Sequence, residues 1–398
     1  MEWFESDDAG VRADLVDLAS GAHERVQADY LVACDGANSM VRNALGVPLA
    51  GAGVLGHPAH LFFRAPGLLD QCGRAPGTFF LAIDRDGLWA NIRLVDPIDA
   101  VWRLMVLDTD GCAAAETLDR AALLRRAVGR TIAVEWLGAS IWTRRAVVAE
   151  SYRDGRVFLA GDAVHQLSPT GALGMNTGIG DAVDLGWKLA AVLQGWGGGE
   201  LLASYEAERR PVGLRNVAMA AEFHLQHEEF ERGFAAIEDE GEEGRALRRR
   251  CGEALVRNVG RMFRTIGLQI GYRYEASPIC IADGTPAPPD EPAAYVPTAR
   301  PGARAPHAWL GDGRSTLDLF GRRFVLLRLG ADAPDGAGLA AAAAIRGMPL
   351  EVVALDAPEI AGLYARRLVL VRPDGHVAWR ADAAPDHPGH IIDRVRGA

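Results

Sequence analysis

The chain has 398 residues, enough for two or three domains, and its 49% hydrophobic and 24% charged residues are typical of globular proteins. Its net charge of −10 argues against binding to nucleic acid, and the sequence gives no reason to expect a membrane partner. The N-terminus is acidic, unlike a signal peptide, and the five cysteines show no CxxC spacing. We expect a cytoplasmic protein with neither a disulfide framework nor a metal site.

A hairpin over 11–30 is predicted first, followed by a strand, a turn and a short helix. The strand covers 30–34 and ends at Asp35 and Gly36, and the helix over 39–45 carries Arg42. The carboxyl ends of strands are where open α/β sheets bind ligands, so Asp35 is a candidate site residue. The alternative is that the Asp-Gly pair forms only a turn.

A GxGxxG pattern at 51–56 is not interpreted as a dinucleotide site. Such a site needs a strand before the glycines and a helix after them, with an acidic residue about 20 positions on. Here the pattern lies between Val47-Pro48 and His57-Pro58, and we expect a loop.

The segment that follows predicts an antiparallel sheet, interrupted by one helix over 115–128. Alternation within one of its strands places Trp89, Asn91 and Arg93 on one face, which either meets solvent or lines a ligand chamber. The strands are predicted at 61–64, 78–83, 88–95, 101–107 and 131–142.

The most informative stretch covers 156–193. A buried strand over 156–160 ends at Gly161, which permits a sharp turn, and Asp162 then presents a carboxylate. A Pro/Gly loop over 168–171 leads into a helix from Met175 onward. The unpaired N–H groups and the positive dipole end of that helix would face any ligand in the loop.

The rest of the chain predicts helices, a linker and a small α/β unit. One helix is expected to end at Pro211, and 212–265 is expected to be helical. The Pro- and Ala-rich segment 277–301 is typical of a linker. The last hundred residues predict strands at 323–329, 350–354, 368–372 and 376–380, the final two joined by a Pro-Asp-Gly turn.

Two motifs carry a resemblance to a known family. The stretch GDAVHQLSPTGALGMNTGIGDAVDLGWKL at 161–189 resembles the second flavin motif of the class A flavoprotein aromatic hydroxylases, the p-hydroxybenzoate hydroxylase-like monooxygenases. CDGANSMVR at 34–42 resembles their Asp-Gly motif, which contributes to both FAD and NAD(P)H binding. The tail resembles the thioredoxin-like domain of the phenol and aromatic polyketide hydroxylase branch, without its cysteines. Ala172 stands where relatives often carry a second glycine.

The resemblance implies an α/β fold with three domains. An incomplete, three-layer Rossmann-like FAD-binding domain would cover 1–50 and 143–215, with the inserted, mostly antiparallel substrate sheet at 51–142. A helical segment at 216–276 and the linker at 277–301 would precede a thioredoxin-like α/β domain at 302–398. The family's opening strand–GxGxxG–helix unit, which holds the ADP half of FAD, is expected to be missing.

The resemblance also implies a cofactor and its contacts. FAD is the expected cofactor, NAD(P)H the cosubstrate, and O2 and a small aromatic molecule the other partners. Asp162 would accept hydrogen bonds from the ribityl hydroxyls, and Pro169 would lie beside the isoalloxazine ring. The backbone at 174–176 would donate to the flavin's pyrimidine edge. The expected FAD-binding residues are Asp35, Gly36, Arg42, Gly161, Asp162, Pro169, Gly174, Met175 and Asn176.

No catalytic side chain is expected, because in this family the flavin carries out the chemistry through a C4a-hydroperoxide. His165 is predicted to be a structural hydrogen-bonding residue rather than a base. Trp89, Asn91 and Arg93 are the substrate-pocket candidates. The implied function is hydroxylation of a phenolic or polyketide ring, and the tail could support a homodimer. The alternatives are a truncated, non-catalytic binding or interaction protein, and a flavin-dependent reductase of the same fold.

Overall fold

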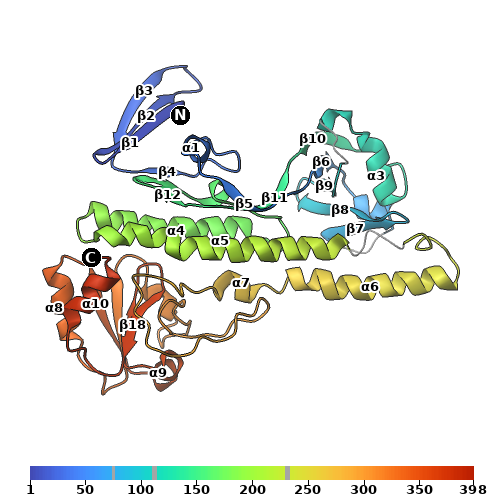
Figure 1. Cartoon of the computed structure of the whole chain (residues 1–398). Coiled ribbons are helices and arrows are strands. Elements are labelled where there is room, and N and C mark those ends of the chain that lie inside the picture. The colour runs from blue at the N-terminus through green and yellow to red at the C-terminus, as the bar shows by residue number, and fades with distance from the viewer. Residues whose placement is uncertain (74–76, 110–113, 229–233) are drawn as a thin grey trace.

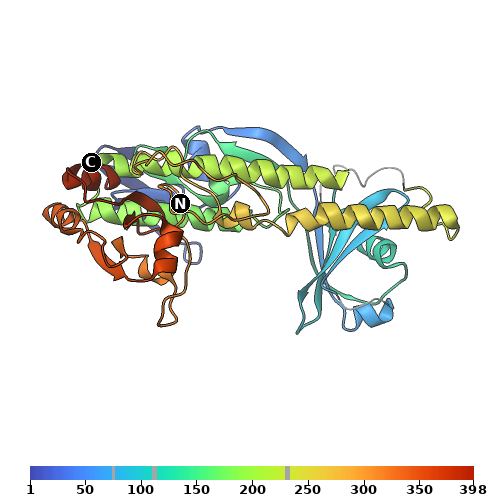
Figure 2. The same ribbon diagram turned by 90° about the horizontal axis from the view of Figure 1, so that it is seen from below.

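The computed structural model describes residues 1–73, 77–109, 114–228 and 234–398 and is elongated (Figures 1 and 2). Two long helices, α4 (Gly174–Leu193) and α5 (Gly199–Glu228), lie side by side along its length. The N-terminal sheets lie on one side of this helix pair and the C-terminal domain on the other, while a further sheet lies near the far end of α5. Within the described ranges, no helix is long and apolar enough to cross a membrane.

The N-terminal region contains the predicted hairpin and a parallel strand pair. β1 (Trp3–Asp7), β2 (Gly10–Val16) and β3 (His23–Ala28) form one antiparallel sheet, whose last two strands are that hairpin. β4 (Leu31–Ala33) then pairs in parallel with β13 (Val157–Leu159), and β12 (Arg153–Asp154) completes this sheet. β13 is fully buried, which explains its continuous apolar sequence.

The GxGxxG pattern lies in a strand, so the loop predicted there is wrong. β5 (Leu49–Gly56) pairs with β11 (Arg144–Ala149) across two register shifts, and β11 also pairs with β14 (His165–Gln166). Glycine permits this irregular pairing, because a Cβ on Gly51 would lie 2.4 Å from the carbonyl oxygen of Ala146. The strand opens no helix, which agrees with excluding a dinucleotide site.

The inserted sheet has five antiparallel strands in the order β10-β6-β9-β8-β7. One face packs on α3 (Arg120–Val128) through a core that includes Leu61, Phe63 and Leu124. A short helix, α2 (Leu68–Gln71), follows β6 in the chain. The strands are β6 (Ala59–Arg64), β7 (Phe79–Asp84), β8 (Gly87–Asp96), β9 (Val101–Val106) and β10 (Glu135–Ile141).

Helix α5 continues through Pro211, so the end predicted there is wrong. Proline removes a backbone donor and usually breaks a helix interior. Here buried side chains on both sides of it, including Tyr205 and Val217, pack in one core with β11 and β13. Tertiary packing therefore outweighs the local preference. α6 (Glu242–Met262) and α7 (Ile266–Ile270) follow.

The C-terminal domain has a four-stranded sheet in the order β16-β15-β17-β18, with one parallel and two antiparallel pairings. Helices α8 (Ala337–Ile345) and α10 (Pro388–Val395) cover one face together with residues of α4 and α5, and α9 (Pro358–Tyr364) covers the other. The strands are β15 (Phe324–Leu329), β16 (Leu350–Leu355), β17 (Leu368–Val371) and β18 (Val377–Ala381).

Candidate functional site

The two predicted strand-end turns meet at one edge of a sheet. β4 and β13 are in parallel register to their last residues, so the turns that carry Asp35 and Asp162 begin side by side. Arg42, on α1 (Met40–Ala44), joins them. Its Nη1 donates to the carbonyl oxygen of Ala37 at 3.2 Å and to that of Ala163 at 2.9 Å. The fold therefore brings the two motifs together.

The two aspartates differ in their surroundings. Both are exposed, and Oδ2 of Asp35 accepts a hydrogen bond from the backbone N–H of Val41 at 3.1 Å. Across the described ranges, the carboxylate of Asp162 makes no hydrogen bond or ion pair with the protein. A carboxylate held at a strand end without a protein donor is suited to accept hydrogen bonds from the hydroxyls of a ligand.

Asp181 is the buried anchor of the Gly161 turn. Its Oδ2 accepts from the backbone N–H of Gly161 at 3.1 Å and lies 2.7 Å from Nε2 of His165, while its Oδ1 accepts from Nε of Arg209 at 2.9 Å. Burial opposes ionisation of Asp181, but the His165 hydrogen bond and the Arg209 charge outweigh it and lower its pKa. His165 is fully buried and hydrogen-bonded, in agreement with its predicted structural role.

The loop between this turn and α4 leaves the helix N-terminus available to a ligand. Helix α4 begins after Leu173 with no side-chain cap and no acidic residue in its first turn. The first-turn N–H groups of Gly174, Met175 and Asn176 therefore have no acceptor within the helix. Pro169 is exposed on the same loop, and Met175 is 77% exposed. This geometry suits a ligand that carries partial negative charge.

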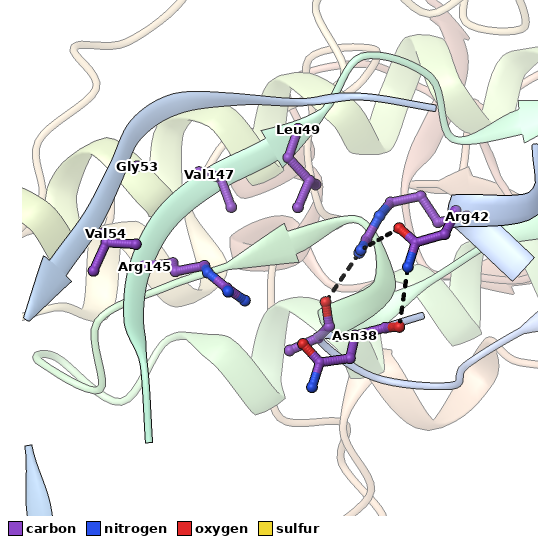
Figure 3. A pocket seen from close by; sticks show the side chains of 9 residues that line it. Asn38, Arg42, Leu49, Gly53, Val54, Arg145 and Val147 are labelled. Atoms are coloured by element: carbon purple, nitrogen blue, oxygen red, sulfur yellow. Dashed lines mark hydrogen bonds between the residues drawn. The ribbon is translucent and has the colours of Figure 1, made fainter. Parts of the chain in front are cut away.

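A cavity of about 380 Å³ lies beside the Asp-Gly turn (Figure 3). Asn38, Arg42 and Asn43 line one side, and residues of β5 and β11, including Arg145, line the other. Nε of Arg42 is buried and has no hydrogen-bond partner, and burial lowers the pKa of this guanidinium. No acidic residue is among those that line the cavity, so its electrostatics suit an anion.

These features fit FAD. Gly161 has a φ of +64°, and a Cβ there would meet nothing within 4 Å, so the space in front of the turn is open. Asp162 follows Gly161 in that turn and its carboxylate makes no hydrogen bond within the described ranges, and α4 offers unpaired donors for the flavin ring. Gly36, with a φ of +81°, forms the matching turn at Asp35. No protein group competes for these positions in the described part of the chain.

The substrate-pocket candidates do not share one face. The pairing of β7 with β8 shifts between Ala82 and Ile83, opposite Trp89, and this β-bulge interrupts the alternation. Trp89 packs on the α3 side, where the guanidinium carbon of Arg126 lies 4.2 Å from its ring centroid. Asn91 and Arg93 remain on the opposite face, and only these two are brought together.

The sequence motifs do not identify Asp181 and Arg209 as residues of the site. Asp181 and Arg209 are 28 positions apart, and their ion pair exists only because α4 packs on α5. A signal was nevertheless present, since Asp181, Asp184 and Lys188 recur at helical spacing on the buried face of an otherwise apolar helix. Buried charged residues of this kind require partners.

The fold and the two turns define a flavin-binding protein with an inserted sheet. Comparison with known proteins gives the family: residues 1–220 match the model described as FAD binding domain, and 298–398 match the model described as aromatic-ring hydroxylase, C-terminal. The chain belongs to the FAD-dependent aromatic-ring hydroxylases. The α/β fold class and the FAD expectation are thereby confirmed.

Curated relatives are FAD-dependent monooxygenases. The chain is 37% identical over 98% of its length to the FAD-dependent monooxygenase apdD of Emericella nidulans, and covers 66% of that protein. It is 37% identical over 96% of its length to a putative polyketide hydroxylase of Streptomyces halstedii, and covers 69% of it. The chain therefore spans about two thirds of the length of these relatives.

Solved structures of similar proteins support the same family. RebC with bound 7-carboxy-K252c has a TM-score of 0.90 and 44% identity, covering 100% of this chain and 74% of RebC. Aklavinone-11 hydroxylase in complex with FAD and aklavinone has a TM-score of 0.79 and 31% identity, covering 99% of this chain and 73% of the hydroxylase chain.

Proposed function

We propose that this chain acts as an FAD-dependent monooxygenase that hydroxylates a phenolic or polyketide aromatic substrate with NAD(P)H and O2. The observation that carries the proposal is the pair of turns at Asp35 and Asp162, joined by Arg42 and opening onto the uncapped N-terminus of α4. The relatives named as polyketide hydroxylases and monooxygenases support this reading over a reductase.

The residues proposed to hold FAD act by position and charge. Asp162 would accept hydrogen bonds from the ribityl hydroxyls, and Gly161 leaves space for them. Pro169 would lie beside the flavin ring, and the first-turn N–H groups of α4 would donate to its pyrimidine edge. When bound, FAD supplies the redox and oxygen chemistry, with NAD(P)H as the reductant.

Further site residues are proposed from the same geometry. Asp35, Gly36 and Arg42 form the second turn, next to the cavity with Arg145 that suits the phosphates of a nucleotide (Figure 3). Asn91 and Arg93 lie on the sheet face proposed to contact substrate, and Trp89 does not. The residue ranges expected for the domains, the cytoplasmic location and a homodimer stay predictions.

Flavin binding by the 398-residue chain tests the site. We expect the purified chain to quench FAD fluorescence saturably, and Asp162→Ala to weaken binding about tenfold, since hydrogen bonds to a charged group are worth about 1.5–3 kcal/mol. Asp154→Ala is the matched control, because Asp154 is exposed on β12 of the same sheet. Equal affinities for wild type and Asp162→Ala would contradict the assignment of Asp162.

Turnover distinguishes the three alternatives. A hydroxylase consumes NAD(P)H in the presence of an aromatic substrate and incorporates one atom of ¹⁸O2 into the product. A reductase consumes NAD(P)H without incorporating oxygen. Flavin binding without any substrate-dependent oxidation of NAD(P)H would support the non-catalytic alternative.

A further inference from the structure

One arginine of α5, Arg209, is linked to both elements of the proposed flavin site. Its Nε donates to Oδ1 of Asp181 at 2.9 Å, and Asp181 in turn accepts from the backbone N–H of Gly161, in the turn that carries Asp162. Its Nη2 donates to the carbonyl oxygen of Thr177 at 3.0 Å, directly after the helix N-terminus proposed to face the flavin ring. The guanidinium therefore connects the Gly161 turn with the start of α4.

The backbone of α4 leaves room for this guanidinium. Arg209 is 1% exposed, and a Cβ on Gly180 would lie 2.6 Å from its Nη2. A Cβ on Gly178 would lie 3.3 Å from Cα of Gly161, so α4 also packs directly on the turn. Glycine is unfavourable inside a helix, and here the close approach of the guanidinium and of the turn accounts for it. A larger residue at 180 must displace the Arg209 side chain.

The contacts of Arg209 need the planar fork of a guanidinium. Its Nε and Nη2 donate to two acceptors on different turns of α4, and its Nη1 donates to the hydroxyl of Tyr274 at 3.3 Å. A lysine would carry the same charge on a single ammonium, which cannot keep these three directions. Arg209 is therefore suited to fix the spacing of backbone elements, in addition to neutralising Asp181.

Tyr274 connects Arg209 to the C-terminal domain. It is buried, its backbone N–H donates to the carbonyl oxygen of Gly302 at 2.9 Å, and its ring stacks on His376 with centroids 4.3 Å apart. Gly302 and His376 lie within 298–398, the range matched by the C-terminal family model. Since the helix pair lies between this domain and the N-terminal sheets (Figure 1), these contacts run through it from the C-terminal domain to the Gly161 turn.

We propose that Arg209 is a positioning residue of the flavin site, which is held by Tyr274 and fixes the spacing between the Gly161 turn and the N-terminus of α4. Arg209 is buried and its three nitrogens all donate to protein acceptors, so it acts through the backbone and does not touch FAD. The inference rests on the proposed function, since it concerns the site assigned there to FAD. It also gives the C-terminal domain a part in flavin binding.

Gly180→Ala tests the position of the guanidinium without removing it. Alanine is favoured in a helix, but its Cβ would displace Nη2 of Arg209. We expect FAD to bind about tenfold more weakly in fluorescence titrations, as when the partners of ligand-binding side chains are lost at metal sites. Gly186→Ala is the control in the same helix, because nothing lies within 4 Å of its added Cβ. Equal FAD affinities of the two variants would overturn the proposal.

Arg209→Lys keeps the charge and removes the fork. FAD affinity should again fall about tenfold. The visible circular dichroism of bound FAD, which reports the orientation of its ring, should change as well. Arg380→Lys is the matched control, since Arg380 is also buried and donates to Asp283 and to the carbonyl oxygen of Tyr364, away from α4. Wild-type affinity and dichroism in Arg209→Lys would show that charge alone suffices and would overturn the proposal.

Hydrogen exchange without FAD tests the positioning role independently of the function. Backbone amides in 157–181 should exchange about tenfold faster in Arg209→Lys than in the wild type, because local opening becomes easier. Those of β15 in the C-terminal sheet should keep their wild-type rates. An increase of the same size throughout the chain would mark Arg209 as a general structural residue and count against the proposal. Failure of the wild type to bind FAD would contradict the proposed function and leave this measurement unaffected.

Tyr274→Phe tests the part of the C-terminal domain. It removes only the hydroxyl that accepts from Arg209, so FAD affinity should fall about threefold, as the loss of one hydrogen bond predicts. Tyr364→Phe is the control, because it removes a hydroxyl that donates to the carbonyl oxygen of Pro306 within the same domain. Equal FAD affinities of the two variants would overturn the role given to Tyr274.

Discussion

At the scale of single residues, Ala172 shows how the loop before α4 is shaped. It adopts a φ of +55°, a left-handed conformation that costs a non-glycine residue about 1–2 kcal/mol. Its carbonyl oxygen accepts a hydrogen bond from Nδ2 of Asn176 at 3.0 Å, which holds the loop against the first turn of α4. The site therefore keeps a strained backbone directly beside the donors assigned to the flavin ring.

Replacing Ala172 with glycine should stabilise the protein. Glycine relieves the strain of the left-handed conformation, which raises the free energy of unfolding. Because glycine is also more flexible in the unfolded chain, the net gain is about 0.5–1 kcal/mol. Urea denaturation measures this difference. Ala182→Gly, at an exposed interior position of α4, should show the opposite sign, a loss of about 1 kcal/mol. Destabilisation by Ala172→Gly would show that the loop is not strained.

His60 gives the sheet a dependence on pH. Burial, then the charges of Arg103 and Arg144, lower its pKa from 6.5 to about 4. The contact with Nε1 of Trp142 is consistent with a neutral ring, because Nε2 must then be the acceptor. Between these two pKa values the unfolded chain binds a proton that the folded chain does not. Stability therefore falls as the pH drops through 6.5 towards 4.

We expect the wild-type chain to lose about 1 kcal/mol more than His60→Gln between pH 7 and pH 5, after allowing for the partial exposure of the ring. Glutamine keeps an acceptor for Trp142 but does not titrate. The free energies of unfolding from denaturant titrations at the two pH values give the comparison. An equal loss in both proteins would mean that His60 is protonated in the folded state.

At the scale of elements, β5 and β11 fit together only through glycine. Gly51 has a φ of +145°, and a Cβ there would lie 2.4 Å from the carbonyl oxygen of Ala146 on β11. The strand lines the cavity beside the Asp-Gly turn, so its irregular register shapes that wall. Gly51, the first glycine of the GxGxxG pattern, thus has a packing role.

Gly51→Ala should destabilise the protein by more than about 2 kcal/mol, because both the backbone conformation and the space exclude a side chain. Gly53→Ala is the control: its φ is also positive, at +81°, but nothing lies within 4 Å of the added Cβ. Gly53→Ala should lower the free energy of unfolding only by the strain of the left-handed backbone, about 1–2 kcal/mol. Thermal melting of both variants provides the measurement, and equal losses would exclude the steric explanation.

Elements with strong local signals are predicted well from the sequence. The strand at 157–159 is continuously apolar, and Gly161 marks its end, so the turn and the helix after it follow from local rules. Pro211 misleads because packing on both sides of it outweighs its local effect. The position of Trp89 depends on a bulge that the alternation of polar and apolar residues does not reveal. The helical spacing of Asp181, Asp184 and Lys188 indicates buried charges, but the partner of Asp181, Arg209, follows only from the packing of α4 on α5.

At the scale of the whole molecule, a buried ion network joins the C-terminal domain to α4 and α5. Nη1 of Arg372, after β17, donates to Oε1 of Glu208 at 2.6 Å, and its Nη2 lies 3.1 Å from Oδ2 of Asp184. Lys188 bridges Asp184 and Glu208 at 2.6 Å each. These side chains are at most 1% exposed. The C-terminal domain is therefore anchored to α4, the helix whose N-terminus is proposed to face the flavin.

This network contains one more carboxylate than it has cations. The network has two cations, Lys188 and Arg372, and three carboxylates, the third being Asp374. Burial raises the pKa of Asp184, and the charge of Glu208 adds to that effect against the pull of Lys188. Arg372 and Lys188 overcome burial to lower the pKa of Glu208. The network is thus neutral when Asp184 keeps its proton.

Arg372→Met should destabilise the protein by about 3–5 kcal/mol, because it leaves buried carboxylates without their main partner. The contact between the C-terminal domain and the helix pair should loosen first, so limited proteolysis should cleave the predicted linker, 277–301, faster in the variant than in the wild type. Arg346→Met, which removes an arginine paired with Asp393 at the partly exposed surface of the same domain, should cost less than about 1 kcal/mol and leave the linker protected. Equal linker cleavage in wild type and Arg372→Met would mean that the apolar contacts of α8 and α10 with α4 and α5 hold the domain without the network.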